Sequence, residues 1–383
     1  MKLQTMQLTI PPGMIDLGVG QPSVSLLPLD IMKQAAEHRL NQTDPSLLAY
    51  GHEPGCSCFR TVLADFLTEG YHMPVSPEYL LITCGATHAL DLICSFFARP
   101  GDVVFVEEPS YFLALRIFME RGLTPVCIPM DENGLSIDAL EEKLKKHRPS
   151  FLYTIPTFHN PSGITLPESR RRKLVELSRK HDFFIVADEV YHLLSFGAWR
   201  PPPPMMHFDE SSDRVLSVGS FTKILAPGLR LGWIQTSPAL LDRFTRSGLM
   251  TSSGGFNPFT SALVRSVIEL GLLRDHLDFL KQIYQQRSQI LFNGLKTYLP
   301  DEMEFNKPEG GFFIWCRIPE SSDAEILRTL ALEHHVGFQP GHRFSAVGGL
   351  KNYLRLSFSY YDTNDLIEGI QRLATALKSP RCP

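Results

Sequence analysis

The chain has 383 residues, of which 43% are hydrophobic and 20% are charged, and its net charge is −4. This length allows one large domain and one smaller domain, and the composition is that of an ordinary globular enzyme. The small negative charge gives no reason to expect nucleic acid or a membrane surface as a partner, and no stretch approaches 18 uninterrupted apolar residues.

Between residues 79 and 221, apolar runs alternate with amphipathic helical patterns. This alternation predicts an α/β fold with a mostly parallel sheet that helices cover on both faces. Ligands of such sheets bind beyond the carboxyl ends of the strands. The expected strands are 79–85, 102–109, 124–130, 151–157, 183–190 and 214–221, and the expected helices are 86–99, 111–122, 136–147 and 167–182.

The remainder of the chain changes character. From residue 257 to about residue 299 the pattern is almost continuously helical, with a weak point at Gly271. Two strand-like segments and two helical segments follow, which predicts a small α+β domain. We expect a large domain over 46–285, a small domain over 286–383, and an N-terminal arm over 1–45 that forms part of the small domain. The expected tail elements are the strands 310–319 and 353–361 and the helices 323–336 and 364–378.

The seven cysteines are scattered, and their number is odd. This pattern indicates free thiols in a reducing compartment, so we expect a cytoplasmic protein. Cys56 and Cys58 lie near His52, but no second cluster with zinc-ligand spacing follows, so we expect no metal.

The segment SVGSFTKILAPGLRLGW places Lys223 just after a buried strand. A buried ammonium is costly unless it is paired or deprotonated, and a lysine with a lowered pKa suits Schiff-base chemistry on a carbonyl. Ser220 and Arg230, in the same segment, suit a phosphate group. An aldehyde beside a phosphate describes pyridoxal phosphate, which we expect this chain to bind.

The segment ITCGATHALDL supports a phosphate site where a strand turns into a helix. Gly85, Ala86 and Thr87 occupy that turn. Free backbone N–H groups and the helix dipole attract anions there, although such a turn alone is a weak signal. Ser220 and Arg230 would add a hydroxyl and a bidentate donor to the same phosphate.

Polar residues after other strands suit a pyridine ring. Asp188 ends an apolar strand, and protonation of a ring nitrogen would give its carboxylate a partner and improve the ring as an electron sink. Tyr191 and Asn160 could hydrogen-bond the ring's 3′ oxygen, and Tyr111 offers a face for stacking. A helix cap for the aspartate and simple packing for the tyrosines are the alternatives.

Arg355 is the candidate anchor for a substrate carboxylate. It alternates with Leu354 and Leu356, so it faces away from them on its strand. The guanidinium fork pairs well with an α-carboxylate, whereas the plain alternative is a solvent-exposed arginine.

Together these motifs resemble the fold type I, class I and II pyridoxal-phosphate-dependent aminotransferases over nearly the whole chain. SGGFNPFTS and GGFFIW are most similar to the 2-aminoadipate and kynurenine branch of that family. Ala86 departs from the pattern, since many members carry serine there. The motifs are IDLGVGQP, AYGHEPGCSCFR, GATHAL, EEPSYF, HNPSG, ADEVY, SFTKILAPGLRLGW, GGFFIW, PGHRF and NYLRLSFS.

The resemblance implies a role for each matching position. Lys223, Asp188 and Tyr191 would be catalytic, with Lys223 as the Schiff-base lysine that also shuttles the proton. Tyr50 resembles the tyrosine that reaches the phosphate in the neighbouring subunit, which implies a homodimer. The substrate carboxylate would be bound by Arg355, Asn160 and the backbone at Gly20. The cofactor would be held by Gly85, Ala86, Thr87, Tyr111, Asn160, Asp188, Tyr191, Ser220, Lys223, Arg230 and Tyr50.

The implied activity moves an amino group from an aromatic, 2-aminoadipate or aliphatic L-amino acid to a 2-oxo acid such as 2-oxoglutarate. Two alternatives stay open. A C–S β-lyase uses the same fold, cofactor and lysine. A non-catalytic sensor, as found in some transcription regulators, carries a DNA-binding module ahead of this domain, whereas here the family pattern begins by Ile15. The S-x-x-K pattern at Ser220–Lys223 lacks the S-D-N and K-T-G companions of serine acyltransferases.

Overall fold

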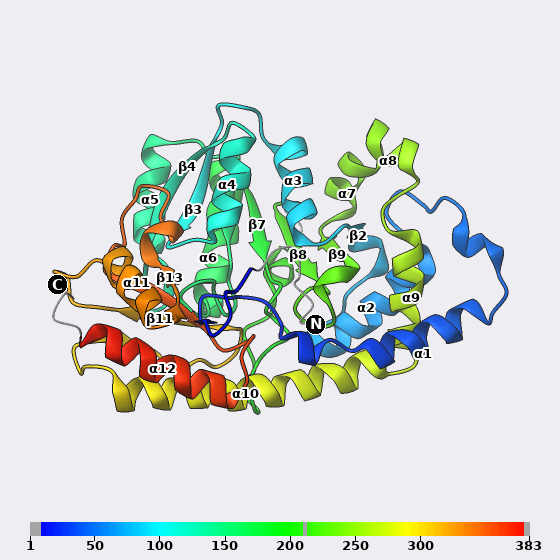
Figure 1. The fold of residues 1–383 in the computed structure, drawn as a ribbon. Helices are drawn as coiled ribbons and strands as arrows, with labels where there is room; N and C mark the ends of the chain where they lie inside the picture. Colours follow the sequence, from blue (N-terminus) through cyan, green and yellow to red (C-terminus); the bar gives the residue numbers. More distant parts are fainter. Residues whose placement is uncertain (1–8, 210–212, 379–383) are drawn as a thin grey trace.

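The structure is a computed structural model that describes residues 9–209 and 213–378. Its framework is an eight-stranded sheet and a four-stranded sheet, and the long helix α10 (Leu272–Tyr298) runs along one side of both (Figure 1). No helix within the described ranges is long and apolar enough to cross a membrane. Cys382 lies outside those ranges, and the six cysteines inside them are free thiols.

The eight-stranded sheet has the order β2-β9-β8-β7-β6-β3-β4-β5. Its five central strands run parallel, from β8 to β4, while β9, β2 and β5 each pair antiparallel with a neighbour. The prediction of a mostly parallel α/β sheet is therefore confirmed. The strands are β2 (Leu80–Thr83), β3 (Val103–Glu108), β4 (Thr124–Asp131), β5 (Gly134–Leu135), β6 (Phe151–Thr154), β7 (Phe184–Asp188), β8 (Val215–Ser220) and β9 (Gly232–Gln235).

Helices cover both faces of this sheet because side chains alternate along each strand. Val106, Tyr153 and Val186 pack on the face that carries α2, α3 and α4, whereas their neighbours Phe105 and Leu152 pack toward α5 and α6. The helices of this part are α2 (Ser57–Tyr71), α3 (Ala86–Phe97), α4 (Phe112–Glu120), α5 (Ile137–Lys146), α6 (Glu168–His181), α7 (Pro238–Thr245), α8 (Gly248–Ser253) and α9 (Pro258–Glu269).

Local sequence explains where several helices begin and end. Ser136 caps α5 by accepting a hydrogen bond from the Ala139 N–H at 3.3 Å, and three lysines in its last turn suit the helix dipole. Gly271, with φ of 75°, separates α9 from α10, which confirms the weak point expected there. Six short 3₁₀ helices also occur within the described ranges, at Val24–Leu26, Pro45–Leu48, Pro77–Tyr79, Met205–Phe208, Pro227–Leu229 and Gly341–Phe344.

The second sheet is antiparallel, with the order β10-β11-β14-β13. The N-terminal segment joins this part, because β1 pairs in parallel with β12. Its last helix is capped by Asp362, whose carboxylate accepts from two backbone N–H groups. The elements are β1 (Ile15–Asp16), β10 (Glu304–Phe305), β11 (Phe313–Arg317), α11 (Ala324–Glu333), β12 (Val336–Gly337), β13 (Gln339–Pro340), β14 (Tyr353–Ser357) and α12 (Thr363–Leu377).

Two details differ from the expected elements. The strand expected over 353–361 ends at Ser357, because the chain turns toward the N-terminal segment. There Ser357 and Ser359 share a hydrogen bond of 2.9 Å, and the Ser359 hydroxyl donates to the Gln21 carbonyl at 2.8 Å. The N-terminal segment contacts both parts of the chain, since α1 (Leu29–Leu40) packs on α9. Helix α10 passes through residue 285 without a break. The domain boundaries expected at residues 45 and 285 therefore stay predictions.

Candidate active site

A cavity of about 330 Å³ opens where β6, β7 and β8 end. Its wall is completed by Asp16 and residues 18–22, ahead of α1, and by Gln339 and Arg355 of the small sheet. The topology accounts for this position, because the carboxyl ends of parallel strands meet at one edge of a sheet. All the predicted site residues line the cavity except Gly85 and Tyr50, namely Gly20, Ala86, Thr87, Tyr111, Asn160, Asp188, Tyr191, Ser220, Lys223, Arg230 and Arg355.

Lys223 is the amine of this cavity. Its Nζ donates a hydrogen bond to the Gly20 carbonyl at 3.1 Å and lies 5.4 Å from the centre of the Phe312 ring. Burial lowers the pKa of Lys223 to about 8, and the positive charge of Arg355 acts in the same direction, while Asp188 opposes it. A substantial fraction of this amine is therefore neutral near pH 8, which is the form that attacks a carbonyl.

Asp188 ends β7 and is only 5% exposed. Its Oδ2 accepts a hydrogen bond from the Tyr153 hydroxyl at 2.8 Å, whereas its Oδ1 has no hydrogen-bond partner within the described part of the chain. Burial raises the pKa of Asp188 to about 6, and the Tyr153 hydrogen bond opposes this rise. A buried carboxylate oxygen without a partner is costly, so this atom suits a ligand that brings a proton donor.

The turn between β2 and α3 presents hydrogen-bond donors to the cavity. Gly85 precedes the helix with φ of 85°, and it supplies no side-chain cap, so the first N–H groups of α3 are left for a ligand. Gly85 does not line the cavity, but its missing side chain has a purpose, since a Cβ there would lie 3.0 Å from Arg230 Nη2. Ser220 ends β8 beside this turn, and its hydroxyl donates to Thr222 Oγ1 at 2.8 Å.

Arg230 holds an uncommon backbone conformation at this end of the cavity. Its φ of 46° lies in the left-handed region, which a residue with a Cβ adopts only when its surroundings compensate. The side-chain amide of Asn257 donates to the Arg230 carbonyl, and Asn257 is left-handed as well. The SGGFNPF segment therefore supports the arginine. Backbone N–H groups, a hydroxyl and a guanidinium form a donor set that fits a phosphate.

Arg355 is 3% exposed, so the solvent-exposed alternative for this residue is wrong. Its Nη1 donates to Asn160 Oδ1 at 2.8 Å and its Nη2 donates to the Gly18 carbonyl at 2.7 Å. The guanidinium carbon lies 4.1 Å from the centre of the Phe313 ring. Burial lowers the pKa of Arg355 to about 10, so it stays charged at neutral pH. Its buried Nε has no partner within the described residues.

The two predicted tyrosines line the cavity from different segments of the large sheet's edge. Tyr191 follows β7, and its ring meets Phe312 and Phe313 edge to face, with centroids 5.3 and 5.7 Å apart. Tyr111 precedes α4, and burial raises its pKa to about 12. Burial also raises the pKa of Tyr191 well above its ordinary value, so both hydroxyls stay protonated at neutral pH and can donate hydrogen bonds in the cavity.

Some site residues lie outside the sequence-based prediction, and one predicted residue lies elsewhere. Thr222 and Gln339 line the cavity, and Tyr153 bonds Asp188, although none of these was predicted. Tyr153 could have been proposed because its predicted strand precedes the strand that Asp188 ends. The sequence does not show, however, how the residues of those two strands are aligned. Tyr50 is 87% exposed and does not line this chain's cavity.

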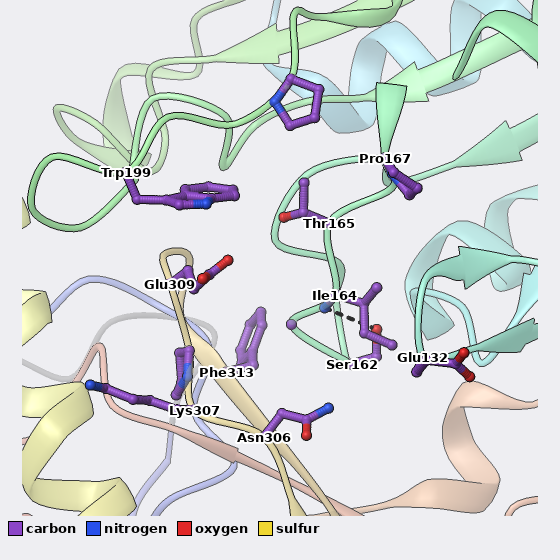
Figure 2. A pocket seen from close by; sticks show the side chains of 13 residues that line it. Glu132, Ser162, Ile164, Thr165, Pro167, Trp199, Asn306, Lys307, Glu309 and Phe313 are labelled. Carbon is purple, nitrogen blue, oxygen red and sulfur yellow. Dashed lines mark hydrogen bonds between the residues drawn. The ribbon is translucent and has the colours of Figure 1, made fainter. Parts of the chain in front are cut away.

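A second cavity shares only Phe313 with the first (Figure 2). Figure 2 shows the Trp199 ring above Glu309, with the loop from Ser162 to Thr165 on the other side. None of the predicted site residues lines it. The first cavity, which combines an amine, a buried acid and two arginines, is therefore the candidate active site.

Comparisons with known proteins agree with this assignment. Residues 12–373 match the family described as Aminotransferase class I and II. The chain is 35% identical to "Aromatic-amino-acid aminotransferase 1" of Thermococcus litoralis, over 95% of this chain and 88% of that protein. It is 33% identical to "2-aminoadipate transaminase" of Thermus thermophilus, over 98% and 93% of the two chains.

A solved structure agrees in fold. The kynurenine aminotransferase of Pyrococcus horikoshii, in complex with pyridoxamine phosphate (PMP), superposes with a TM-score of 0.89 at 32% identity, over 96% of this chain and 91% of that one. These likenesses match the branch expected from the motifs and do not favour the lyase or the sensor. The chain belongs to the class I and II aminotransferase family, and it is an aminotransferase of fold type I with pyridoxal phosphate as its cofactor.

Proposed function

We propose that the cavity at the ends of β6, β7 and β8 catalyses transfer of an amino group from an L-amino acid to a 2-oxo acid such as 2-oxoglutarate. The donors are amino acids with aromatic, 2-aminoadipate or aliphatic side chains. The names of the relatives in Thermococcus, Thermus and Pyrococcus support the aromatic and 2-aminoadipate donors. The observation that carries the proposal is that one cavity holds Lys223, Asp188 and Arg355 together.

The residues at the sheet edge fit the ring of the cofactor. Asp188 would pair its free Oδ1 with the ring nitrogen and keep that nitrogen protonated. Tyr191 and Asn160 would donate to the 3′ oxygen, because Asn160 uses its Oδ1 for Arg355 and keeps its amide N–H groups. Tyr111 would stack on the ring. The unpartnered, buried Oδ1 of Asp188 is the observation that supports this fit.

The donors at the other end fit the phosphate. They come from the α3 turn, from the end of β8 and from the β8–β9 loop, so the anion would meet both a helix N-terminus and a guanidinium. The residues proposed to bind the phosphate in this subunit are Gly85, Ala86, Thr87, Ser220 and Arg230.

The substrate carboxylate would bind to the guanidinium of Arg355, beside Asn160 and the backbone at Gly20. A Cβ at Gly20 would lie 2.9 Å from the Phe313 ring and 3.4 Å from Arg355 Nη2. Only a glycine therefore leaves this space open next to the guanidinium. A carboxylate in this space would lie next to the buried guanidinium of Arg355. Their attraction would be strong, because little water is present to screen it.

The proposed reaction depends on a proton that Lys223 carries from one carbon atom to another. When bound, pyridoxal phosphate supplies an aldehyde that condenses with amines and a ring that stabilises negative charge at the substrate's Cα. Lys223 Nζ would take the proton from the substrate's Cα and deliver it to the C4′ carbon of the cofactor, and its lowered pKa suits general-base catalysis near neutral pH. The Asp188 carboxylate would keep the ring nitrogen protonated throughout. In two half-reactions, an amino acid leaves as a 2-oxo acid and a second 2-oxo acid takes up the amino group.

We also propose that the protein is a cytoplasmic homodimer in which Tyr50 of the partner subunit reaches the phosphate. The exposure of Tyr50 and of its neighbour Leu48 supports an interface there, and the free thiols support the cytoplasm. Inactive Lys223→Ala and Tyr50→Ala variants, mixed and allowed to exchange subunits, should regain about a quarter of wild-type activity, because mixed dimers contain one intact site. A monomer in sedimentation, or no recovery, would refute the shared site.

The activity itself is tested by mixing the purified holoenzyme with a panel of L-amino acids and following the yellow absorbance of the bound cofactor. Loss of the yellow band with each accepted donor, and its return on adding 2-oxoglutarate, is the expected result. Release of pyruvate and ammonia from cystathionine without an acceptor would instead identify a β-lyase. A holoenzyme that responds to no amino acid would overturn the proposal.

A further inference from the structure

We propose that Tyr153 is a positioning residue that acts on the cofactor through Asp188. This inference rests on the proposed pairing of Asp188 with the ring nitrogen. The Tyr153 hydroxyl donates to Asp188 Oδ2 at 2.8 Å, and the tyrosine is fully buried. Asp188 lines the cavity, whereas Tyr153 is absent from its lining among the described residues. The hydrogen bond that connects Tyr153 to the lining of the cavity ends on the carboxylate of Asp188.

The sheet fixes this pair of residues. Strand β6 lies between β3 and β7, and Tyr153 stands opposite Val186 of β7. Asp188 follows Val186 by two residues, so its side chain emerges on the same face as Tyr153. Helix α4 packs against the Tyr153 ring, and the Phe118 ring of that helix contacts it edge to face, with the two ring centres 5.3 Å apart. The position of the Tyr153 phenol is therefore fixed by strand β6 and by its packing against helix α4.

The hydrogen bond determines which carboxylate oxygen faces the cofactor. A carboxylate at the end of a strand can turn about its last torsion angle, because that torsion is broad. With Oδ2 held by Tyr153, Oδ1 is the oxygen left without a partner. Loss of the phenol would remove the side-chain hydrogen bond that distinguishes Oδ2 from Oδ1, and the two oxygens would then compete for the ring nitrogen.

The same bond also favours the charged form of the carboxylate. Burial raises the pKa of Asp188, and donation by the Tyr153 hydroxyl opposes that rise. Burial likewise raises the pKa of Tyr153 well above its ordinary value, so the phenol remains a donor at any working pH. Without the phenol, Asp188 would shift toward its neutral form, which stabilises a protonated ring nitrogen less.

The test compares Tyr153→Phe with Tyr284→Phe. Tyr284 is an apt control because it is also fully buried, and its hydroxyl has no hydrogen-bond partner in the described ranges. In the cofactor-free protein, ¹³C NMR of the aspartate carboxyls should show the Asp188 midpoint raised by about one pH unit in Tyr153→Phe. Tyr284→Phe should leave the midpoint where it is.

The loaded enzyme provides two further readouts. With ¹⁵N-labelled pyridoxal phosphate, the ring nitrogen of Tyr153→Phe should move toward the shift of an unprotonated pyridine. The kcat should fall about tenfold, which corresponds to that one pH unit, while the donor KM changes less than about threefold. In an Asp188→Asn background, Tyr153→Phe should add no further loss, since its effect passes through Asp188.

An unchanged Asp188 midpoint in folded Tyr153→Phe would overturn the inference, and so would an equal loss of kcat in the Asp188→Asn background. The NMR titration needs no cofactor, so it separates this inference from the proposed function. If the wild-type protein failed to react with any amino acid while the Asp188 midpoint still shifted, the function would be wrong and the link between Tyr153 and Asp188 would stand.

Discussion

Arg355 and Asn160 share a hydrogen bond of 2.8 Å that connects the small sheet to the loop after β6 of the large sheet. Asn160 Oδ1 accepts this bond, and the Gly18 carbonyl accepts a second one from the same guanidinium. The proposed substrate anchor and a proposed ring ligand are therefore held in one network. A shift of the small sheet would move both, so substrate binding and cofactor orientation should respond together.

Replacing Arg355 with lysine should lower kcat/KM for amino acids by about 100-fold, because an ammonium cannot reproduce the two-pronged hydrogen bond to a carboxylate. Steady-state kinetics with a reactive donor and 2-oxoglutarate measures this. The amine that corresponds to the same donor without its carboxylate provides the control, since its slow reaction should be the same in both proteins. An unchanged kcat/KM in Arg355→Lys would contradict the role of Arg355.

The rate at which the cofactor-free protein captures pyridoxal phosphate should rise about tenfold from pH 7 to pH 9. Burial lowers the pKa of Lys223 to about 8, so the neutral amine grows from about one tenth to about nine tenths of the total over this range. Stopped-flow absorbance gives the rate. Binding of 4-deoxypyridoxine phosphate, which lacks the aldehyde, serves as the control and should not follow this curve. A flat profile for pyridoxal phosphate itself would argue against a buried amine.

From pH 3 to pH 8 the cofactor-free wild type should lose up to about 3 kcal/mol of unfolding free energy through the ionisation of Asp188. Asp188→Asn should not show this loss. The folded protein holds the Asp188 proton up to about pH 6, whereas the unfolded chain releases it near pH 4. Stability from this group is therefore present at low pH and is lost as pH rises between 4 and 6. Urea unfolding at both pH values measures the difference, and an equal change at both would refute it.

Ala86→Ser should tighten binding of pyridoxal phosphate by about three- to tenfold. The first residue of α3 lines the cavity, and a hydroxyl there would donate one more hydrogen bond to the phosphate. Equilibrium titration of the cofactor-free protein gives the dissociation constant. Pyridoxal, which has no phosphate, should bind both proteins equally. Equal tightening for pyridoxal would show that the serine acts elsewhere.

Much of the sheet and its edge could be predicted from the sequence, because local patterns specify them. The apolar runs predicted the parallel strands, and Gly271 predicted the break between α9 and α10. Lys223 and Asp188 stood out since charged groups beside buried strands need a chemical reason. They line the same cavity because the carboxyl ends of parallel strands converge.

What the sequence could not supply depends on contacts between distant segments. Strand register decides that Tyr153 shares a face with Asp188, and register is absent from local pattern. Alternation predicted the direction in which Arg355 faces, but its burial depends on Phe313 and Asn160, which come from other elements. The exposed Tyr50 gains its proposed role only beside a second chain, so a single chain leaves that role untested.

The most direct test of the Schiff-base role of Lys223 is reduction of the loaded protein with borohydride, followed by mass spectrometry of its peptides. We expect the pyridoxyl phosphate group on Lys223, which lines the cavity together with Asp188 and Arg355. Attachment to another lysine, or a protein that stays colourless and unlabelled with excess pyridoxal phosphate, would contradict it.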